Sequence, residues 1–363
     1  MIQELFDDLR NFAEYAAGHA DEKYLSLYLN TDPADPENQS QTPAWHIFLK
    51  NAVAEIEAGL DPVQTKQWKN VRLSDNDPNK EWARIRKRLD KYLTSYRPES
   101  KTLALFISPG GEYRFDLPVR LNNVRYYGKP HIQEFLWAVD EYEVHMVALM
   151  AEDEARVVRV ALDRTGTDAT IVSDQQWLRK QRKAAHNESI ESRKDELTRR
   201  FVRGVAADAD KFFLQNPDIE RVILGGDQRL ANALLGAVHP AVKEKVIAVM
   251  SIPAHLPAHE IAGRIRETAE QAEREYEDAL MVEVISQARA GGRGAEGTVA
   301  VGRALDRGAV RLLAMPYPAG DDAEPLLLQA VRQGCVIEFL HGAAAERAAA
   351  SGGIVAQLYY AIN

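Results

Sequence analysis

Alternating and helical spacings of apolar residues predict an α+β unit in the first part of the chain. The segment KYLSLYLN alternates apolar and polar positions, and a polar loop follows it to about Pro43. Apolar residues then recur at three- and four-residue intervals from Trp45 until Gly59. A Pro-Gly-Gly turn between two apolar runs predicts a β-hairpin. The expected elements are a strand at 23–30, helices at 45–59 and 79–96, and paired strands at 101–108 and 113–117.

The pattern changes in the second part of the chain. After a short helix, two apolar runs separated by three acidic residues predict another hairpin. Strands and helices then alternate, which predicts a parallel sheet with crossover connections. The expected elements are a helix at 131–141, strands at 144–150, 155–162, 221–225 and 246–251, and helices at 190–215, 229–236 and 257–278.

The last part, from about residue 282, repeats the alternation on a smaller scale. It predicts helices at 299–306 and 324–333 and strands at 310–315, 336–340 and 354–362, which together suggest a compact αβα sandwich. The expected fold class is therefore α/β and α+β, in three domains at 1–125, 126–280 and 281–363. A chain of 363 residues is longer than one hydrophobic core usually organises, which agrees with several domains.

Composition narrows the class of protein. The single cysteine, Cys335, excludes an intramolecular disulfide, and the acidic N-terminus lacks the basic segment of a signal peptide. No apolar run approaches the roughly 20 residues of a membrane span, so we expect a cytoplasmic protein without a membrane partner. The strand-end aspartates Asp153, Asp163 and Asp227 are interpreted as turn formers, and neither a metal nor a cofactor is expected.

One basic stretch stands out from a chain with a net charge of -9. That overall charge argues against non-specific wrapping of nucleic acid by the whole protein. Between Arg179 and Arg203, however, nine residues are basic and four are acidic. Positive charge on a helix and its leading loop suits contacts with phosphate, and a solvated helix face is the alternative interpretation. The candidate RNA-binding residues are Arg179, Lys180, Arg182, Lys183, Arg193, Lys194, Arg199 and Arg200.

A set of co-linear segments resembles the archaeal and eukaryotic class-1 peptide chain release factors and their Pelota relatives, specifically the bacterial branch of that superfamily. The first domain carries SLYLNTDP, KTLALFIS and EYRFDLP, followed by YYGKPHIQEFLWAV. The middle domain carries VHMVALMAEDEARVVRVAL and RVILGGD, and the last domain carries VAVGRALDRGAVRLLAM and SGGIVAQLYYAIN. The resemblance covers about residues 20–363.

The resemblance implies a role for each domain. Residues 1–125 would correspond to the decoding domain, 126–280 to an RNase H-like middle domain, and 281–363 to an αβα sandwich of the kink-turn-binding type. It also implies the ribosome and tRNA as partners, through contacts with rRNA, and not DNA. In Pelota-like systems a translational GTPase is a further partner, and only the resemblance suggests one here.

The sequence departs from the superfamily at the catalytic loop. Release factors hydrolyse peptidyl-tRNA with a Gly-Gly-Gln loop, whose glycines allow close backbone approach while the glutamine helps to place a water molecule. The matching segment between Leu162 and Ile190 contains no Gly-Gly pair. Its glutamines are Gln175, Gln176 and Gln181, which are interpreted as solvated loop residues. Gln176 and Gln181 are kept as weak candidates for a catalytic residue.

The sequence also departs from the superfamily at the codon-reading motif. Release factors inspect the stop codon with an Asn-Ile-Lys-Ser type motif that precedes a helix. The matching decoding-loop position here is Asn38, Gln39 and Ser40, and it lacks the lysine. The neighbouring acids Asp32, Asp35 and Glu37 would repel phosphate, so a plain solvated loop is the alternative interpretation.

Three functions remain open at this point. The preferred hypothesis is a release-factor/Pelota-like, ribosome-associated factor that acts at the A site in termination, rescue or a stalling response without Gly-Gly-Gln hydrolysis. The second is a peptidyl-tRNA hydrolase that uses a different group in the loop at 163–189. The third is a protein that binds structured RNA away from the ribosome through its C-terminal fold.

Overall fold

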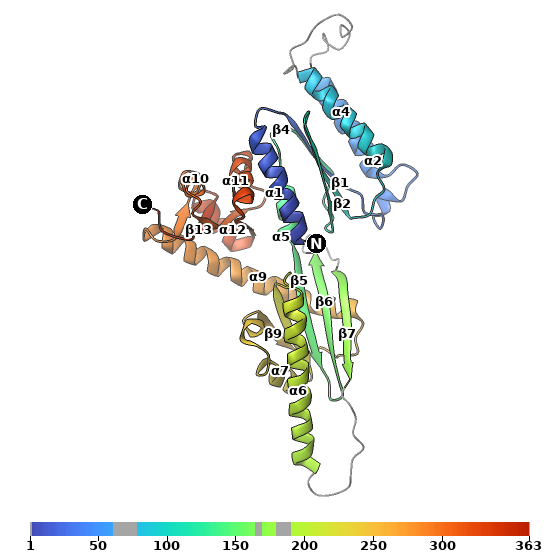
Figure 1. Ribbon diagram of the computed structural model, residues 1–363, viewed down its shortest axis with the longest axis vertical. Helices are drawn as coiled ribbons and strands as arrows, with labels where there is room; N and C mark the ends of the chain where they lie inside the picture. Colours follow the sequence, from blue (N-terminus) through green and yellow to red (C-terminus); the bar gives the residue numbers. More distant parts are fainter. Residues whose placement is uncertain (1, 61–77, 164–168, 179–189, 363) are drawn as a thin grey trace, which may run out of the picture. The chain divides into compact units, whose positions relative to one another are not determined.

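The computed structural model describes residues 2–60, 78–163, 169–178 and 190–362 (Figure 1). Its contacts group the chain into two compact units. The first unit is formed by Met1–Asp140 together with Glu277–Asn363, and the second by Glu141–Tyr276. None of the described helices combines the length and apolar character that crossing a membrane requires.

The N-terminal part of the first unit is built on an antiparallel sheet with the strand order β3-β2-β1-β4. Leu25, Leu27 and Leu29 of β1 point to one face of the sheet, because successive side chains of a strand alternate between faces. Tyr24 and Tyr28 point to the other face and are fully buried. The strands are β1 (Tyr24–Asn30), β2 (Thr102–Ile107), β3 (Glu112–Leu117) and β4 (Val124–Gly128).

Helices cover both faces of this sheet. On the leucine face, α2 (Ala44–Gly59) and α4 (Pro78–Ser95) bury their apolar sides in one cluster that includes Trp45 and Trp82. On the other face, Phe12 of α1 (Ile2–Gly18) stacks on Phe106 of β2 with ring centroids 4.5 Å apart. The short helix α5 (Gln133–Asp140) places Phe135 against Phe115 of β3. The sheet is therefore the middle layer of three.

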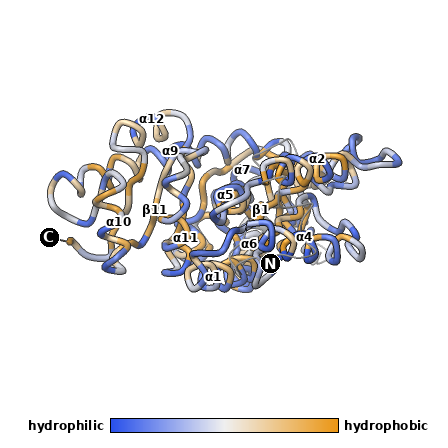
Figure 2. Tube along the Cα trace, turned by 90° about the horizontal axis from the view of Figure 1, so that it is seen from above, coloured by the Kyte–Doolittle hydropathy of each residue, from blue (hydrophilic) through white to orange (hydrophobic). Residues whose placement is uncertain are grey.

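The C-terminal part of the first unit has its own four-stranded sheet, in the order β10-β13-β11-β12. Strand β11 is its apolar centre, paired in parallel with β12 and antiparallel with β13 (Figure 2). Its strands are β10 (Gly294–Glu296), β11 (Val310–Pro316), β12 (Val336–Leu340) and β13 (Val355–Leu358). Its helices are α10 (Thr298–Asp306), α11 (Glu324–Gln333), α12 (Gly342–Ala350) and the last turns of α9 (Ala258–Arg289).

The second unit is a five-stranded mixed sheet in the order β7-β6-β5-β8-β9. Strands β5, β8 and β9 are parallel, and β6 and β7 continue the sheet antiparallel. Its strands are β5 (Tyr142–Met150), β6 (Glu154–Asp163), β7 (Ala169–Leu178), β8 (Arg221–Gly226) and β9 (Val246–Met250). The first turns of α9 cover one face, where Ile261 and Ile265 join Val147 and Val160 in one apolar cluster.

The remaining helices of this unit lie near β8. Helix α7 (Gln228–Leu235) packs on β8, and α6 (Ile190–Gln215) packs against α7. The short helix α8 (Pro240–Lys243) leads into β9. The parallel crossover arrangement of β5, α6, β8, α7 and β9 confirms the order predicted from the alternation of apolar runs.

Several predicted elements need correction. The segment 163–189 was expected to be a loop, but Ala169–Leu178 forms strand β7 on the edge of the sheet. Strand β4 was missed, and the final strand is shorter than 354–362. Helix α9 extends to Arg289, beyond the predicted end at residue 278. The mixed α/β class with separate sheets is confirmed, whereas the division into three domains stays a prediction.

Candidate nucleic-acid interface

Helix α6 is amphipathic, and its exposed face carries arginines. Val202, Val205 and Ala206 are buried, and the apolar stripe continues at Ala209 and Phe212. These intervals of three and four residues place them on one side of the helix. Arg199, Arg200 and Arg203 of its middle turns are all exposed, with Arg199 and Arg203 beside the buried stripe and Arg200 on the opposite side. The helix is therefore held by its apolar side while its cationic side remains accessible to a ligand.

The three arginines differ in their ion pairing. Arg200 donates from Nε to Oε1 of Glu196 at 2.8 Å, one helical turn away. That hydrogen bond, with the charges of the nearby arginines, lowers the pKa of Glu196. Arg199 and Arg203 make no salt bridge with any residue that the structure describes. Two of the three guanidinium groups are therefore available to an anion that approaches from outside.

Only part of the predicted basic stretch can be located. Arg179, Lys180, Arg182 and Lys183 lie outside the described residues, and so does the candidate Gln181. Arg193 and Lys194 belong to the first turns of α6, but their side chains are not among those described. Arg199 and Arg200 are placed as expected for a solvent-facing helix surface. The assignment of these residues to RNA binding stays a hypothesis.

Gln176 lies in strand β7 and not in a loop, which corrects the expectation for it and for Gln175. Both side chains are exposed. Gln176 pairs in register with Arg156 of β6, and its Nε2 donates to Oε2 of Glu154 at 2.5 Å. A glutamine whose amide is held against a carboxylate on a regular strand has less freedom to place a water molecule than one in a glycine loop.

The decoding-loop position forms a compact turn whose polar groups satisfy one another. Asn38 ends the 3-10 helix η1 (Pro36–Asn38), and its Nδ2 donates to the carbonyl of Asn30 at 2.9 Å. Gln39 and Ser40 are exposed, and Oγ of Ser40 donates to the carbonyl of Thr42 at 2.5 Å. The loop is therefore ordered by its own backbone, and Gln39 and Ser40 are the members of the predicted set that face solvent.

An ion pair fixes the base of this loop. Nη2 of Arg120 lies 2.6 Å from Oδ2 of Asp32, which is buried. Although burial alone would raise it, the pKa of Asp32 is lowered, because the hydrogen bonds from Arg120 and from the Ala34 amide outweigh that effect. The charge of Asp32 is therefore neutralised within the unit, and it does not add to repulsion of phosphate as the sequence suggested.

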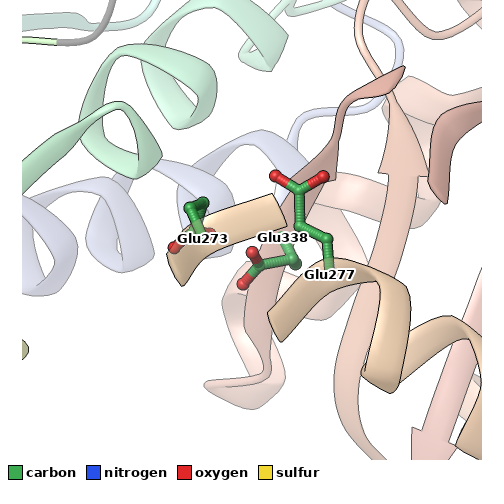
Figure 3. A group of neighbouring side chains, drawn as sticks. All are labelled: Glu273, Glu277 and Glu338. Atoms are coloured by element: carbon green, nitrogen blue, oxygen red, sulfur yellow. The ribbon is translucent and has the colours of Figure 1, made fainter. Parts of the chain in front are cut away.

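Buried glutamates near the end of β12 have a structural explanation. Glu277 of α9 and Glu338 of β12 have carboxylate oxygens within 4.8 Å of each other (Figure 3). Glu277 accepts from the backbone N–H of His341 at 2.7 Å and lies 2.9 Å from Nδ1 of the same residue. It thus holds the residue that begins α12. In the second unit, Glu273 forms its ion pair with Arg221.

The comparisons with known proteins come from one family model and from solved structures. Residues 130–274 match the model of bacterial archaeo-eukaryotic release factor family 10. No functionally curated protein matches the sequence.

Three solved structures illustrate the structural likeness. Pelota from Archaeoglobus fulgidus is 17% identical, with 74% of this chain and 83% of that chain covered and a TM-score of 0.34. Dom34 from S. cerevisiae, a translation termination-like factor that interacts with Hbs1, is 15% identical over 69% of this chain and 73% of its own, with a TM-score of 0.45. Ribosome-bound archaeal Pelota, described with ABCE1, is 16% identical over 70% and 73%, with a TM-score of 0.41.

The family match covers nearly all of the second unit and the residues just before it. It begins just before α5 and ends within α9, so it contains the whole mixed sheet and the basic helix α6. The segments quoted from the sequence for the middle domain lie inside the same range. Residues 130–274 of the chain are therefore similar to the bacterial branch of the release-factor/Pelota superfamily.

Proposed function

We propose that the protein is a cytoplasmic translation factor that binds the ribosome at the A site during termination, rescue or a stalling response. The observation that carries the proposal is the exposed arginine face of α6 inside the family-matched unit. Arg199 and Arg203 have no salt bridge among the described residues, so they can contact phosphate without first breaking an internal one. tRNA and rRNA are the ligands that fit this charge.

We further propose that the factor works without Gly-Gly-Gln hydrolysis. The segment between Asp163 and Ser189 contains one glycine, Gly166, which is followed by threonine. Ten residues of the segment that should carry the loop, Ala169–Leu178, form the regular strand β7. Since the superfamily reaction needs backbone conformations that side chains with a Cβ disfavour, we expect that this segment does not bring a glutamine against the tRNA terminus.

A protein partner is part of the proposal on grounds of family alone. Dom34 interacts with Hbs1, and archaeal Pelota is described on the ribosome with ABCE1. By analogy we propose a translational GTPase as the partner that delivers this chain to the ribosome. The exposed loop residues Gln39 and Ser40 would then face the decoding centre.

Ribosome co-sedimentation tests the proposal directly. The purified protein is mixed with ribosomes that are empty, or stalled with a vacant A site, and pelleted through sucrose at several salt concentrations. We expect association with the stalled complex at low salt, and less association as salt rises, because cation–phosphate contacts release counterions. A protein that stays in the supernatant with every ribosome preparation at low salt would rule the proposal out.

Two further measurements, of binding to naked RNA and of peptide release, separate the two other hypotheses. Binding to naked structured RNA without any ribosome association would support an RNA-binding protein that acts elsewhere. Rapid release of peptide from the stalled complex would support a hydrolase. Cryo-electron microscopy of a pelleted complex would then show which site on the ribosome the chain occupies.

A further inference from the structure

Helices α6 and α7 pack against each other (Figure 1). A groove lined by residues of both helices gathers three arginines. It has a volume of about 430 Å³ and lies entirely within the second unit. Arg199 and Arg203 come from α6, and Arg229 comes from the first turn of α7. The other lining residues are Asp195, Thr198, Val202, Leu230, Ala233, Gly236 and Ala237.

The spacing of these residues explains why the groove exists. On α6, the lining residues recur at intervals of three and four, so they share one side of the helix. Val202 of α6 and Leu230 of α7 are 4% and 2% exposed, and both line the groove. Ala233, Gly236 and Ala237 have small side chains or none, which leaves open space beside the arginines. The groove thus combines large charged side chains of α6 with small residues in the last turn of α7 and just after it.

The charge inside the groove is unbalanced. Three guanidinium groups face one carboxylate, that of Asp195. None of Arg199, Arg203 and Arg229 has a salt bridge with a described residue. Like charges that share a concave surface repel one another, and a bound anion relieves that repulsion. Guanidinium groups present planar pairs of N–H donors that match the oxygen atoms of a phosphate group.

We propose that this groove is a binding pocket for a phosphate group of an RNA backbone. The inference rests on the proposed function, which supplies RNA as the source of the phosphate. No lining residue that the structure describes is aromatic, so the groove offers no platform on which a base could stack. Recognition therefore falls on the phosphate and not on the base, and binding is expected to be independent of RNA sequence.

Arg229 provides the sharpest test of the pocket. It lies outside the basic stretch of α6, and lining the groove is what it has in common with the arginines of that helix. Binding of a short fluorescein-labelled single-stranded RNA is measured by anisotropy at several salt concentrations. We expect Arg229→Gln to weaken RNA binding roughly threefold to tenfold at low salt. The slope of the logarithm of affinity against the logarithm of salt concentration, the salt slope, should fall by about one phosphate contact. Arg229 is exposed, and circular dichroism checks that the variant remains folded.

Two further variants serve as controls of opposite kinds. Arg200→Gln removes the same charge from α6, but Arg200 does not line the groove and is paired with Glu196. Its effect on the salt slope is expected to be clearly smaller than that of Arg229→Gln. Asp195→Asn removes the one carboxylate of the groove and is expected to strengthen RNA binding. Equal effects of Arg229→Gln and Arg200→Gln would overturn the pocket.

Inorganic phosphate distinguishes the source of the bound group. If titrated phosphate binds the wild type and not Arg229→Gln, while RNA binding is the same in both, the pocket takes a free anion and the RNA assignment is wrong. Weaker RNA binding by Arg229→Gln, together with association of the wild-type protein with ribosomes, supports both proposals. Arg229-dependent RNA binding by a protein that never pellets with ribosomes would refute the proposed function alone. Ribosome and RNA binding that are both unchanged in Arg229→Gln would refute the pocket alone.

Discussion

Nδ1 of His131 lies 2.9 Å from Oε1 of Glu324, a residue 193 positions later in the chain. Glu324 opens α11, and its two carboxylate oxygens also accept from the backbone N–H groups of Ile132 and Gln133 at 2.9 and 3.1 Å. It therefore caps the start of α5 while binding the imidazole next to it. Within the first unit, this carboxylate links the N-terminal layers to the C-terminal sandwich.

The protonation of His131 should make the first unit sensitive to alkaline pH. Burial lowers the pKa of His131, but hydrogen bonds to Glu134 and Glu324 and their charges outweigh burial and raise the pKa to about 9. The unfolded pKa is about 6.5. A raised folded pKa means that the stabilisation is fully present below pH 6.5 and is lost as pH rises through about 9. We expect the free energy of unfolding to fall over that interval in urea titrations.

Replacement of Glu324 should reduce this dependence on pH. Glu324→Gln deletes one of the two charges that hold the imidazolium, and we expect a loss of about 1–3 kcal/mol of stability at neutral pH. Glu14→Gln is the matched control, because Glu14 forms an exposed ion pair with Arg332 at 3.3 Å in the same unit. Its expected cost is below about 1 kcal/mol. Similar costs for the two substitutions would contradict the role given to Glu324.

The pattern of apolar residues predicted the elements that form the apolar cores. It did not predict a strand in a segment that has little apolar periodicity. Strand β7 (ATIVSDQQWL) has a single neighbour, β6, and exposes Gln175 and Gln176. Polar cross-strand contacts hold it, including the hydrogen bond from Nε of Arg156 to Asp174 at 2.7 Å. An edge strand that is solvated in this way does not need the alternation by which strands are found in a sequence.

Arg229 shows why the groove could not be predicted. It stands alone in a short helix, 26 positions after Arg203, and no spacing rule relates the two. The packing of α7 against α6 brings them to one groove. The basic face of α6 was predictable, because its arginines are close in sequence and alternate with buried apolar residues. Contacts between separate helices depend on the tertiary fold, which the chain pattern does not specify.

Gly226 should be intolerant of any side chain. It ends β8 with φ of +96°, and an added Cβ would overlap the carbonyl oxygen of Met150. That oxygen also accepts the N–H of Asp227 at 2.7 Å, so the backbone cannot move away without losing a hydrogen bond. We expect Gly226→Ala to lower the free energy of unfolding by roughly 2–4 kcal/mol. Chemical denaturation of the full chain measures the change.

The same substitution at Gly204 is the control for this prediction. Gly204 lies inside α6, and an added Cβ would meet no atom within 4 Å. Alanine is favoured over glycine in a helix, so Gly204→Ala should stabilise the protein by about 0.5–1 kcal/mol. A destabilisation of equal size at both positions would show that the strain assigned to Gly226 is not the cause.

Reversing the charge of the four basic residues that precede α6 should weaken ribosome binding. We expect the variant with Arg179, Lys180, Arg182 and Lys183 all replaced by Glu to lose at least about tenfold in affinity at low salt, since each cation–phosphate contact adds to the salt-dependent term. The chain should remain folded by circular dichroism.

A second fourfold reversal controls for the change in net charge. Lys243, Lys245, Arg264 and Arg274 are exposed on the second unit and lie outside the basic stretch and the groove. Their replacement by Glu changes the net charge by the same amount. Equal losses of ribosome affinity in the two variants would mean that overall charge, and not the stretch at 179–183, controls binding.

Peptide release from ribosome-bound peptidyl-tRNA should proceed no faster than background. The superfamily reaction places backbone against the ester at the tRNA terminus, where two adjacent glycines avoid steric overlap and adopt conformations that are costly for other residues. Here the nearest glycine is Gly166, and Gln176 is fixed on an edge strand by its hydrogen bond to Glu154. Release is followed with a radiolabelled nascent peptide on stalled ribosomes, with a Gly-Gly-Gln release factor as the positive control.

Fast release that disappears on Gln176→Ala or Gln181→Ala would make the protein a hydrolase. Fast release that survives both substitutions would place the catalytic group elsewhere in the chain, and either result would overturn the prediction.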